Sequence, residues 1–123
     1  MGWGVVIADI GQAERVKALI SAELYDYDPD NARRVVGWET QMSAQWHRVT
    51  LADFRAEMVD PEAVEVAFSG GVKLTCWAVT RSNGDYRVVW VPAAEAFSLV
   101  TETKFGPVDI GVHGDAIGCF GSI

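Results

Sequence analysis

The chain has 123 residues, of which half are apolar and only 22% are charged, so its composition excludes a disordered chain. This length suits one hydrophobic core, and we expect a single domain over residues 1–123. Seventeen acidic residues against ten Lys and Arg give a net charge of −7, which disfavours nucleic acid and anionic membrane surfaces and favours a basic protein partner.

The cysteines and the N-terminal stretch bear on the cellular compartment. Cys76 and Cys119 are the only cysteines, and their apolar surroundings do not indicate a disulfide scaffold. The stretch GWGVVIA is short, lacks a basic flank and is followed by Asp9, so it supports neither a signal peptide nor a membrane span. We therefore expect a cytoplasmic, bacterial-type protein with reduced thiols.

The first elements along the chain are predicted near its N-terminus. Residues 3–8 are β-branched and apolar enough for a short strand, or they lead into the helix that follows. Asp9 and Gln12 fit a capping box, and apolar residues then recur at helical spacing through QAERVKALISAEL. This stretch is expected to be the first helix.

Two further helices are predicted before residue 62. The Asp-Pro pair at 28–29 is typical of a helix start and predicts a helix through NARRVVGWETQMSAQW. A break near Gly37, or a strand through RRVVGWE, stays an alternative because β-branched residues and glycine weaken a helix. A capping pattern at Thr50 predicts a third, short helix that ends at the Asp-Pro pair at 60–61.

From residue 62 the apolar pattern changes from a helical period to a twofold period. Gly70-Gly71 predicts a tight hairpin and Asn83-Gly84 predicts a type I′ turn, so three strands should form a meander. A helical turn and a strand should follow Pro92, and the glycine-rich tail should hold one or two more strands, with bulges or turns. The sequence therefore predicts an α+β fold, with N-terminal helices packed on a C-terminal antiparallel sheet, a meander of at least three strands.

The predicted sheet carries apolar residues on both faces. Trp77 lies on the face opposite Cys76, while Trp90 shares a face with Tyr86 and Val88. Such a sheet needs two covers. The helices supply one, and the other comes from the C-terminal segment, a partner subunit or a ligand; the sequence leaves this choice and the oligomeric state open.

The stretch YDYDPDN, residues 25–31, offers the first candidate site. Asp26, Asp28 and Asp30 match the first three acidic positions of an EF-hand calcium loop. The position that needs glycine holds Asn31, however, and the position that needs a bidentate glutamate holds Gly37. We therefore predict no metal in this stretch, and no cofactor elsewhere.

A second interpretation of this stretch is a surface for a basic partner. Tyr25 and Tyr27 offer apolar area with a hydrogen-bonding tip, and Asp26, Asp28 and Asp30 surround them with negative charge. Aromatic anchors supply affinity, and carboxylates steer a basic protein towards them. The alternative is an ordinary acidic loop that caps the next helix.

The stretch VDIGVHGDAIG offers the second candidate site. Asp109, His113 and Asp115 fall on one face of an extended chain, and a histidine with carboxylates can act as acid and base or bind a metal. In a regular strand, however, Asp109 and His113 stand about 13 Å apart. They can act together only if the chain bends at the glycines of this stretch.

No catalytic signature is assembled in the sequence. It contains no GxSxG elbow, P-loop, dinucleotide fingerprint, HExxH helix or pair of CxxC knuckles. His47 could meet Cys76 or His113 in space, but the apolar surroundings of Cys76 argue against a catalytic thiol.

Two functional hypotheses follow from these patterns. The first is a non-enzymatic, acidic protein-binding module, most concretely an inhibitor or immunity-type protein that neutralises a basic toxin or enzyme by occluding its cationic site. The second is a small-molecule-binding domain or small enzyme with a pocket between the helices and a curved sheet. There, His113 would act with Asp109 or Asp115 as acid and base.

Overall fold

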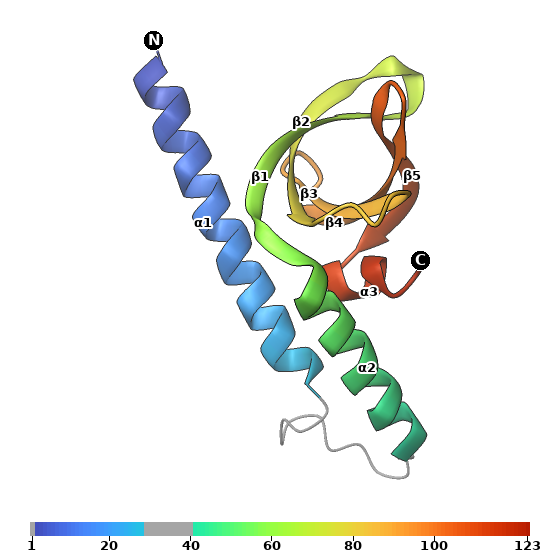
Figure 1. Cartoon of the computed structure of the whole chain (residues 1–123). Helices are drawn as coiled ribbons and strands as arrows, with labels where there is room; N and C mark the ends of the chain where they lie inside the picture. The colour runs from blue at the N-terminus through green and yellow to red at the C-terminus, as the bar shows by residue number, and fades with distance from the viewer. Residues whose placement is uncertain (1, 29–40) are drawn as a thin grey trace.

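The computed structural model describes the backbone of residues 2–28 and 41–123, and the side chains of residues 11–28 and 46–123. Helices come first and strands follow, so the predicted α+β class is confirmed (Figure 1). The elements are α1 (Gly2–Tyr27), α2 (Gln41–Glu57), β1 (Met58–Ala67), the 3₁₀ turn η2 (Ser69–Gly71), β2 (Lys73–Thr80), β3 (Tyr86–Val91), β4 (Ala96–Thr103), β5 (Gly106–Gly114) and α3 (Ala116–Phe120).

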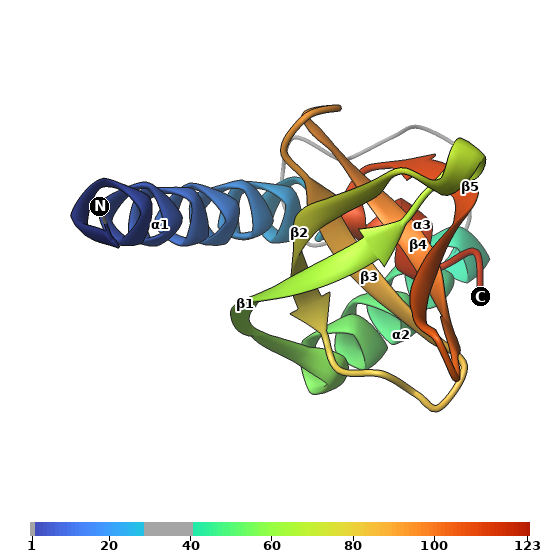
Figure 2. The same cartoon turned by 90° about the horizontal axis from the view of Figure 1, so that it is seen from above.

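The first helix, α1, is 26 residues long and includes residues 3–8, so the strand considered there does not form. Helix propensities of ordinary residues differ by only about 0.7 kcal/mol, and a strongly helical neighbour extends the helix through β-branched residues. Asp9 consequently lies inside the helix and not at its start. The first turns of α1 extend away from the rest of the molecule (Figure 2).

The second helix, α2, continues without a break from Gln41 to Glu57. The predicted separate helix at Thr50 is therefore wrong, because Thr50 lies inside α2. The predicted helix start at 28–29 and the alternatives around Gly37 fall, with residues 29–40, outside the described residues. In the part that is described, no helix is long and apolar enough to cross a membrane.

The predicted helix end at the Asp-Pro pair 60–61 is also wrong, because these residues belong to β1. Met58 pairs with Thr80 and Glu62 with Ala78, so β1 has two more residues than its partner strand between these pairs. Proline has no N–H to donate to a sheet, and a bulge is where a strand tolerates it.

The five strands form a closed barrel in the order β1-β2-β3-β4-β5 (Figure 1). All sequential pairs are antiparallel, as predicted. Because the number of strands is odd, the first and last run in the same direction, and β1 pairs with β5 in parallel through Ala67 and Val108. The sequence predicted the meander but not its closure.

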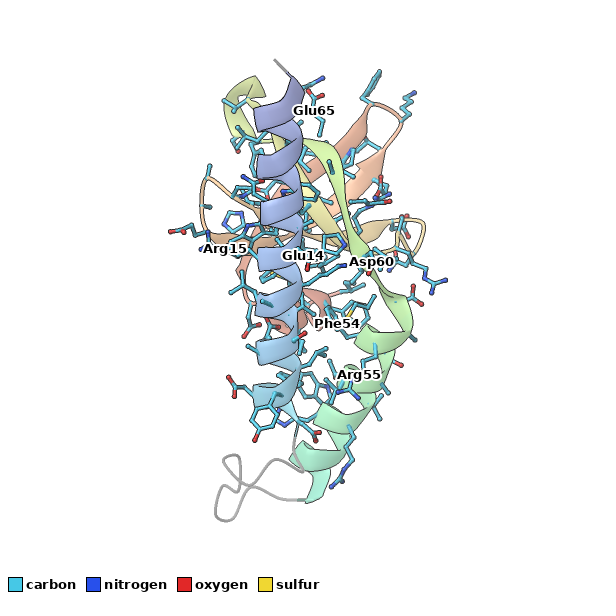
Figure 3. The ribbon with its side chains drawn as sticks, turned by 90° about the vertical axis from the view of Figure 1, so that its left-hand side faces the viewer. Glu14, Arg15, Phe54, Arg55, Asp60 and Glu65 are labelled. Atoms are coloured by element: carbon cyan, nitrogen blue, oxygen red, sulfur yellow. The ribbon has the colours of Figure 1, made fainter. Side chains whose placement is uncertain are left out.

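Both apolar faces of the sheet are covered within the chain. The outer face packs with the helices: Trp77 and Trp90 are cross-strand partners there, both are buried, and Trp77 Nε1 donates a hydrogen bond of 2.8 Å to Gln12 Oε1 on α1. Phe54 of α2 is buried in the same layer, and Figure 3 shows it between α1 and α2. The inner face is covered by closure of the barrel, whose interior holds Val66, Cys76, Ala78, Val89, Val91 and Val100.

The turns agree only in part with the sequence predictions. Gly70 and Gly71 have φ of 80° and 79°, which fits the expected tight turn between β1 and β2. Between β2 and β3 only Gly84 has positive φ, so the predicted type I′ turn is wrong. Asn83 Oδ1 instead accepts hydrogen bonds of 2.9 and 2.7 Å from the backbone N–H groups of Asp85 and Tyr86.

Candidate binding site

A bulge in β5 creates the most distinctive polar arrangement of the barrel. Leu99 pairs with Val112, but the next residue, Val100, pairs with Asp109, so two extra residues of β5 lie between these pairs. One of them is Gly111, with φ of 82°. Glycine adopts this conformation without the steric cost that other residues meet, so it permits the bend that the sequence analysis required.

The bulge places His113 against Asp109. His113 Nε2 lies 3.1 Å from Oδ1 and 3.2 Å from Oδ2 of Asp109, whereas a regular strand would hold these residues about 13 Å apart. Ser98, which is fully buried and pairs with His113 across the strands, donates a hydrogen bond to Asp109 Oδ1. The side chain of Asp109 is 10% exposed and that of His113 is 54% exposed, so a nearly buried carboxylate holds an imidazole at the surface.

Hydrogen bonds join Ser98 to Asp109 and Asp109 to His113, and this order limits the chemistry of the three groups. In a nucleophilic triad the imidazole accepts the proton of the serine hydroxyl. Here the Ser98 hydroxyl bonds to Asp109 and not to His113, so the imidazole does not activate it. The arrangement fixes the orientation of His113 and leaves its second nitrogen, Nδ1, for a ligand or a proton.

A cavity of about 460 Å³ lies at the end of the barrel that carries His113. Its volume is within the range of small-molecule sites, about 300–1,000 Å³. We call it the barrel-mouth pocket. It is lined by Phe68, Leu74, Val91, Ala93, Ala94, Ala96, Phe97 and His113.

Asp115, the other predicted partner of His113, is placed at the N-terminus of α3. Its side chain accepts a hydrogen bond of 2.7 Å from the backbone N–H of Gly118. Glu23 of α1 reaches the same helix end and accepts hydrogen bonds of 2.9 and 2.6 Å from the N–H groups of Ala116 and Ile117. Burial raises the pKa of Glu23, partly offset by these two hydrogen bonds. Both carboxylates therefore cap α3.

The two cysteines are buried and unpaired with each other. Burial raises the pKa of the Cys76 thiol to about 11 and that of Cys119 to about 11. Since the thiolate is the reactive form, neither residue is suited to nucleophilic chemistry at neutral pH.

The acidic stretch lies at the C-terminal end of α1. Tyr25 is 57% exposed, whereas Tyr27 is half-buried and packs against the core, with its ring 4.9 Å from that of His47. Asp26 and Asp28 precede and follow Tyr27 in the sequence and are among the described residues, whereas Asp30 lies outside them. The structure therefore leaves the side chain of Tyr25 exposed at the surface and directs that of Tyr27 inward.

The sequence analysis missed an exposed tryptophan close to this helix end. Trp46 is 53% exposed and its ring centroid lies 5.3 Å from that of His47, so Tyr27, His47 and Trp46 form an aromatic row from α1 to α2. Trp46 also lines a hollow of about 440 Å³, together with Asp53 and other residues of α2 and the C-terminal segment. The local sequence Trp-His-Arg at residues 46–48 does not indicate that the tryptophan is exposed.

In the described part of the chain, no group of three or more His, Cys, Asp and Glu side chains could hold a metal ion. Comparisons with models of protein families, with curated proteins and with solved structures found no match. A function for this protein therefore has to be inferred from the geometry of its sites.

Proposed function

We propose that this protein binds a small, largely apolar molecule at the mouth of its barrel, with His113 as the polar contact. One observation carries the proposal: the cavity of about 460 Å³ reaches His113, whose imidazole is held by the buried carboxylate of Asp109. Ligand sites are commonly apolar, preformed cavities with a few well-placed polar groups, and barrel mouths are frequent locations for them.

The remaining lining residues support an apolar ligand. Besides His113, every residue that lines the barrel-mouth pocket is apolar. Ser98 and Asp109 lie behind the imidazole and fix it, so the polar group requires no rearrangement when a ligand enters. Because Ser98 is not activated, the arrangement is better suited to binding than to nucleophilic catalysis.

An aromatic probe tests this proposal directly. Equilibrium dialysis with 2-methoxynaphthalene should show saturable binding to the wild-type protein. Ala94→Trp, at an exposed lining position, should abolish binding by filling the pocket. Ala52→Trp, at an exposed position of α2, is the matched control and should bind the probe like the wild type. Equal binding by the two variants would show that the probe does not occupy the pocket.

A second candidate function is recognition of a basic protein through the acidic end of α1. It is favoured by the exposure of Tyr25, 57%, and by the absence of a basic residue from the last turn of α1. A helix C-terminus carries about half a negative elementary charge, which adds to the charges of Asp26 and Asp28. A basic toxin or enzyme, which this protein would inhibit, would be steered to the C-terminal end of α1. The neighbouring Trp46 extends the aromatic surface there.

Salt-dependent capture tests the second candidate. The immobilised protein should retain a basic partner from native cytosol at low salt and release it at moderate salt, because the attraction is electrostatic. Asp26→Asn with Asp28→Asn should weaken this retention. Glu62→Gln with Glu65→Gln removes the same charge from exposed positions of β1 and should not. Equal loss in both double variants would refute the placement at α1.

A further inference from the structure

We propose that the barrel-mouth pocket selects an uncharged apolar molecule that carries a hydroxyl group, and that this hydroxyl hydrogen-bonds to Nδ1 of His113. The inference rests on the proposed function of the pocket and adds the chemical class of its ligand. It follows from the tautomer of His113, the charge of the Asp109–His113 pair and the character of the other lining residues.

Asp109 determines which nitrogen of His113 carries the proton. An ionised carboxylate only accepts hydrogen bonds, and both oxygens of Asp109 lie within 3.2 Å of Nε2. The hydrogen bond from Ser98 holds the carboxylate in place. Neutral His113 therefore carries its proton on Nε2, and Nδ1 becomes an acceptor. Nδ1 has no hydrogen-bond partner in the part of the chain that the structure describes.

The charge of the pair argues against an anionic ligand. Asp109 and neutral His113 together carry one negative charge, and protonation of the imidazole only brings the pair to zero. A ligand carboxylate would therefore meet no net positive charge, within a protein of net charge −7. A hydroxyl can donate to the neutral imidazole and accept from the protonated one, so it suits both states.

The other lining residues argue against a cationic ligand. Among the residues that the structure describes, no carboxylate lines the pocket, and an ammonium group would lose hydration against apolar walls. Lys73 contributes no charge there either: it is adjacent to the lining residue Leu74, but side chains alternate along a strand, so Lys73 points to the opposite face of β2. Glu95, in the neighbouring turn, forms an ion pair of 3.0 Å with Arg15 of α1. An uncharged ligand therefore fits the pocket best.

Three probes with the same naphthalene body separate these ligand classes in equilibrium dialysis. Wild-type protein should bind 2-naphthol about fivefold to tenfold more tightly than 2-methoxynaphthalene, which cannot donate a hydrogen bond, and 2-naphthoate should bind most weakly. His113→Phe keeps a ring at this exposed position and removes both nitrogens. It should bind the first two probes with nearly equal affinity.

The outcomes distinguish the two levels of the proposal. If none of the probes binds to the wild type, the proposed function itself is contradicted. If the probes bind without preference for the hydroxyl, if naphthoate binds best, or if His113→Phe keeps the preference, the inference about the ligand is wrong while the pocket stands. Long-range ¹H–¹⁵N spectra at alkaline pH, where imidazole groups are neutral, should independently show the proton of His113 on Nε2; a proton on Nδ1 would overturn the inference.

Discussion

At the scale of single residues, the barrel depends on a few buried polar groups. Ser98 is buried and the side chain of Asp109 nearly so, and the two are joined by a hydrogen bond. A buried polar group without a partner costs free energy, so such pairs are more sensitive to substitution than exposed ones. Asp109 has a further role, because it orients His113.

Ser98→Ala should lower the free energy of unfolding by about 2 kcal/mol, since it removes a hydrogen bond to a buried carboxylate. Urea unfolding measures this change. Ser122→Ala, which removes an exposed hydroxyl bonded to the carbonyl of Gly118, is the matched control and should cost less than about 0.5 kcal/mol. Equal costs would contradict a special role for the buried hydrogen bond.

Cys76 and Cys119 should be almost unreactive in the folded protein. With a pKa of about 11, roughly one thiol in a thousand is ionised at about pH 8, and both side chains are also buried. A disulfide-exchange reagent at this pH should therefore modify neither residue until guanidinium unfolds the chain. Rapid reaction of one thiol in the folded state would be inconsistent with its burial.

At the scale of elements, the bulge in β5 determines whether His113 and Asp109 meet. Gly111→Ala should destabilise the protein by about 1–2 kcal/mol, because alanine is strained at its φ of 82° although no atom lies within 4 Å of the added carbon. Gly11→Ala, inside α1 and equally open, should instead stabilise by about 0.5–1 kcal/mol. Thermal or urea unfolding of both variants should thus give changes of opposite sign.

Glu23 links α1 to α3 and should make stability depend on pH in a defined direction. Its pKa is raised from 4.5 by burial, so the folded protein holds this proton more tightly than the unfolded chain. The stability that this proton contributes is complete below the unfolded pKa and is lost as pH rises through the folded pKa. From about pH 4 to pH 7, the wild type should therefore lose stability relative to Glu23→Gln. A relative gain would contradict the raised pKa.

The sequence predicted the elements that depend on local pattern. The twofold alternation of β1, β2 and β3 and the helical spacing through Val16 and Ile20 are local, and both were confirmed. Barrel closure was not predictable, because a single pair, Ala67 with Val108, joins strands about forty residues apart in the chain.

The candidate site was predictable in its members but not in its geometry. The sequence named His113 and Asp109 and indicated that the chain would have to bend at the glycines of this stretch, without indicating which one. It did not indicate Ser98, because the contact of this residue with Asp109 depends on the register between β4 and β5. The exposure of Trp46 likewise depends on how α2 packs, which no local pattern records.

At the scale of the whole molecule, helices and barrel share one layer of packing. Phe54 of α2 is fully buried and meets Phe120 of α3 edge-on, with ring centroids 5.4 Å apart. Phe54→Ala should therefore cost about 3–5 kcal/mol. Helix content by circular dichroism and the fluorescence of the buried tryptophans should be lost in one transition, at a lower urea concentration. Two separate transitions would contradict a shared core.

The most direct test of the central claim is a titration of ¹⁵N-labelled protein with 2-methoxynaphthalene, followed by amide chemical shifts. We predict saturable shifts at the residues that line the barrel-mouth pocket, with His113 and the turn between β3 and β4 among them. The absence of saturable shifts, or shifts confined to the end of α1 or to the hollow at Trp46, would contradict a ligand site at the mouth of the barrel.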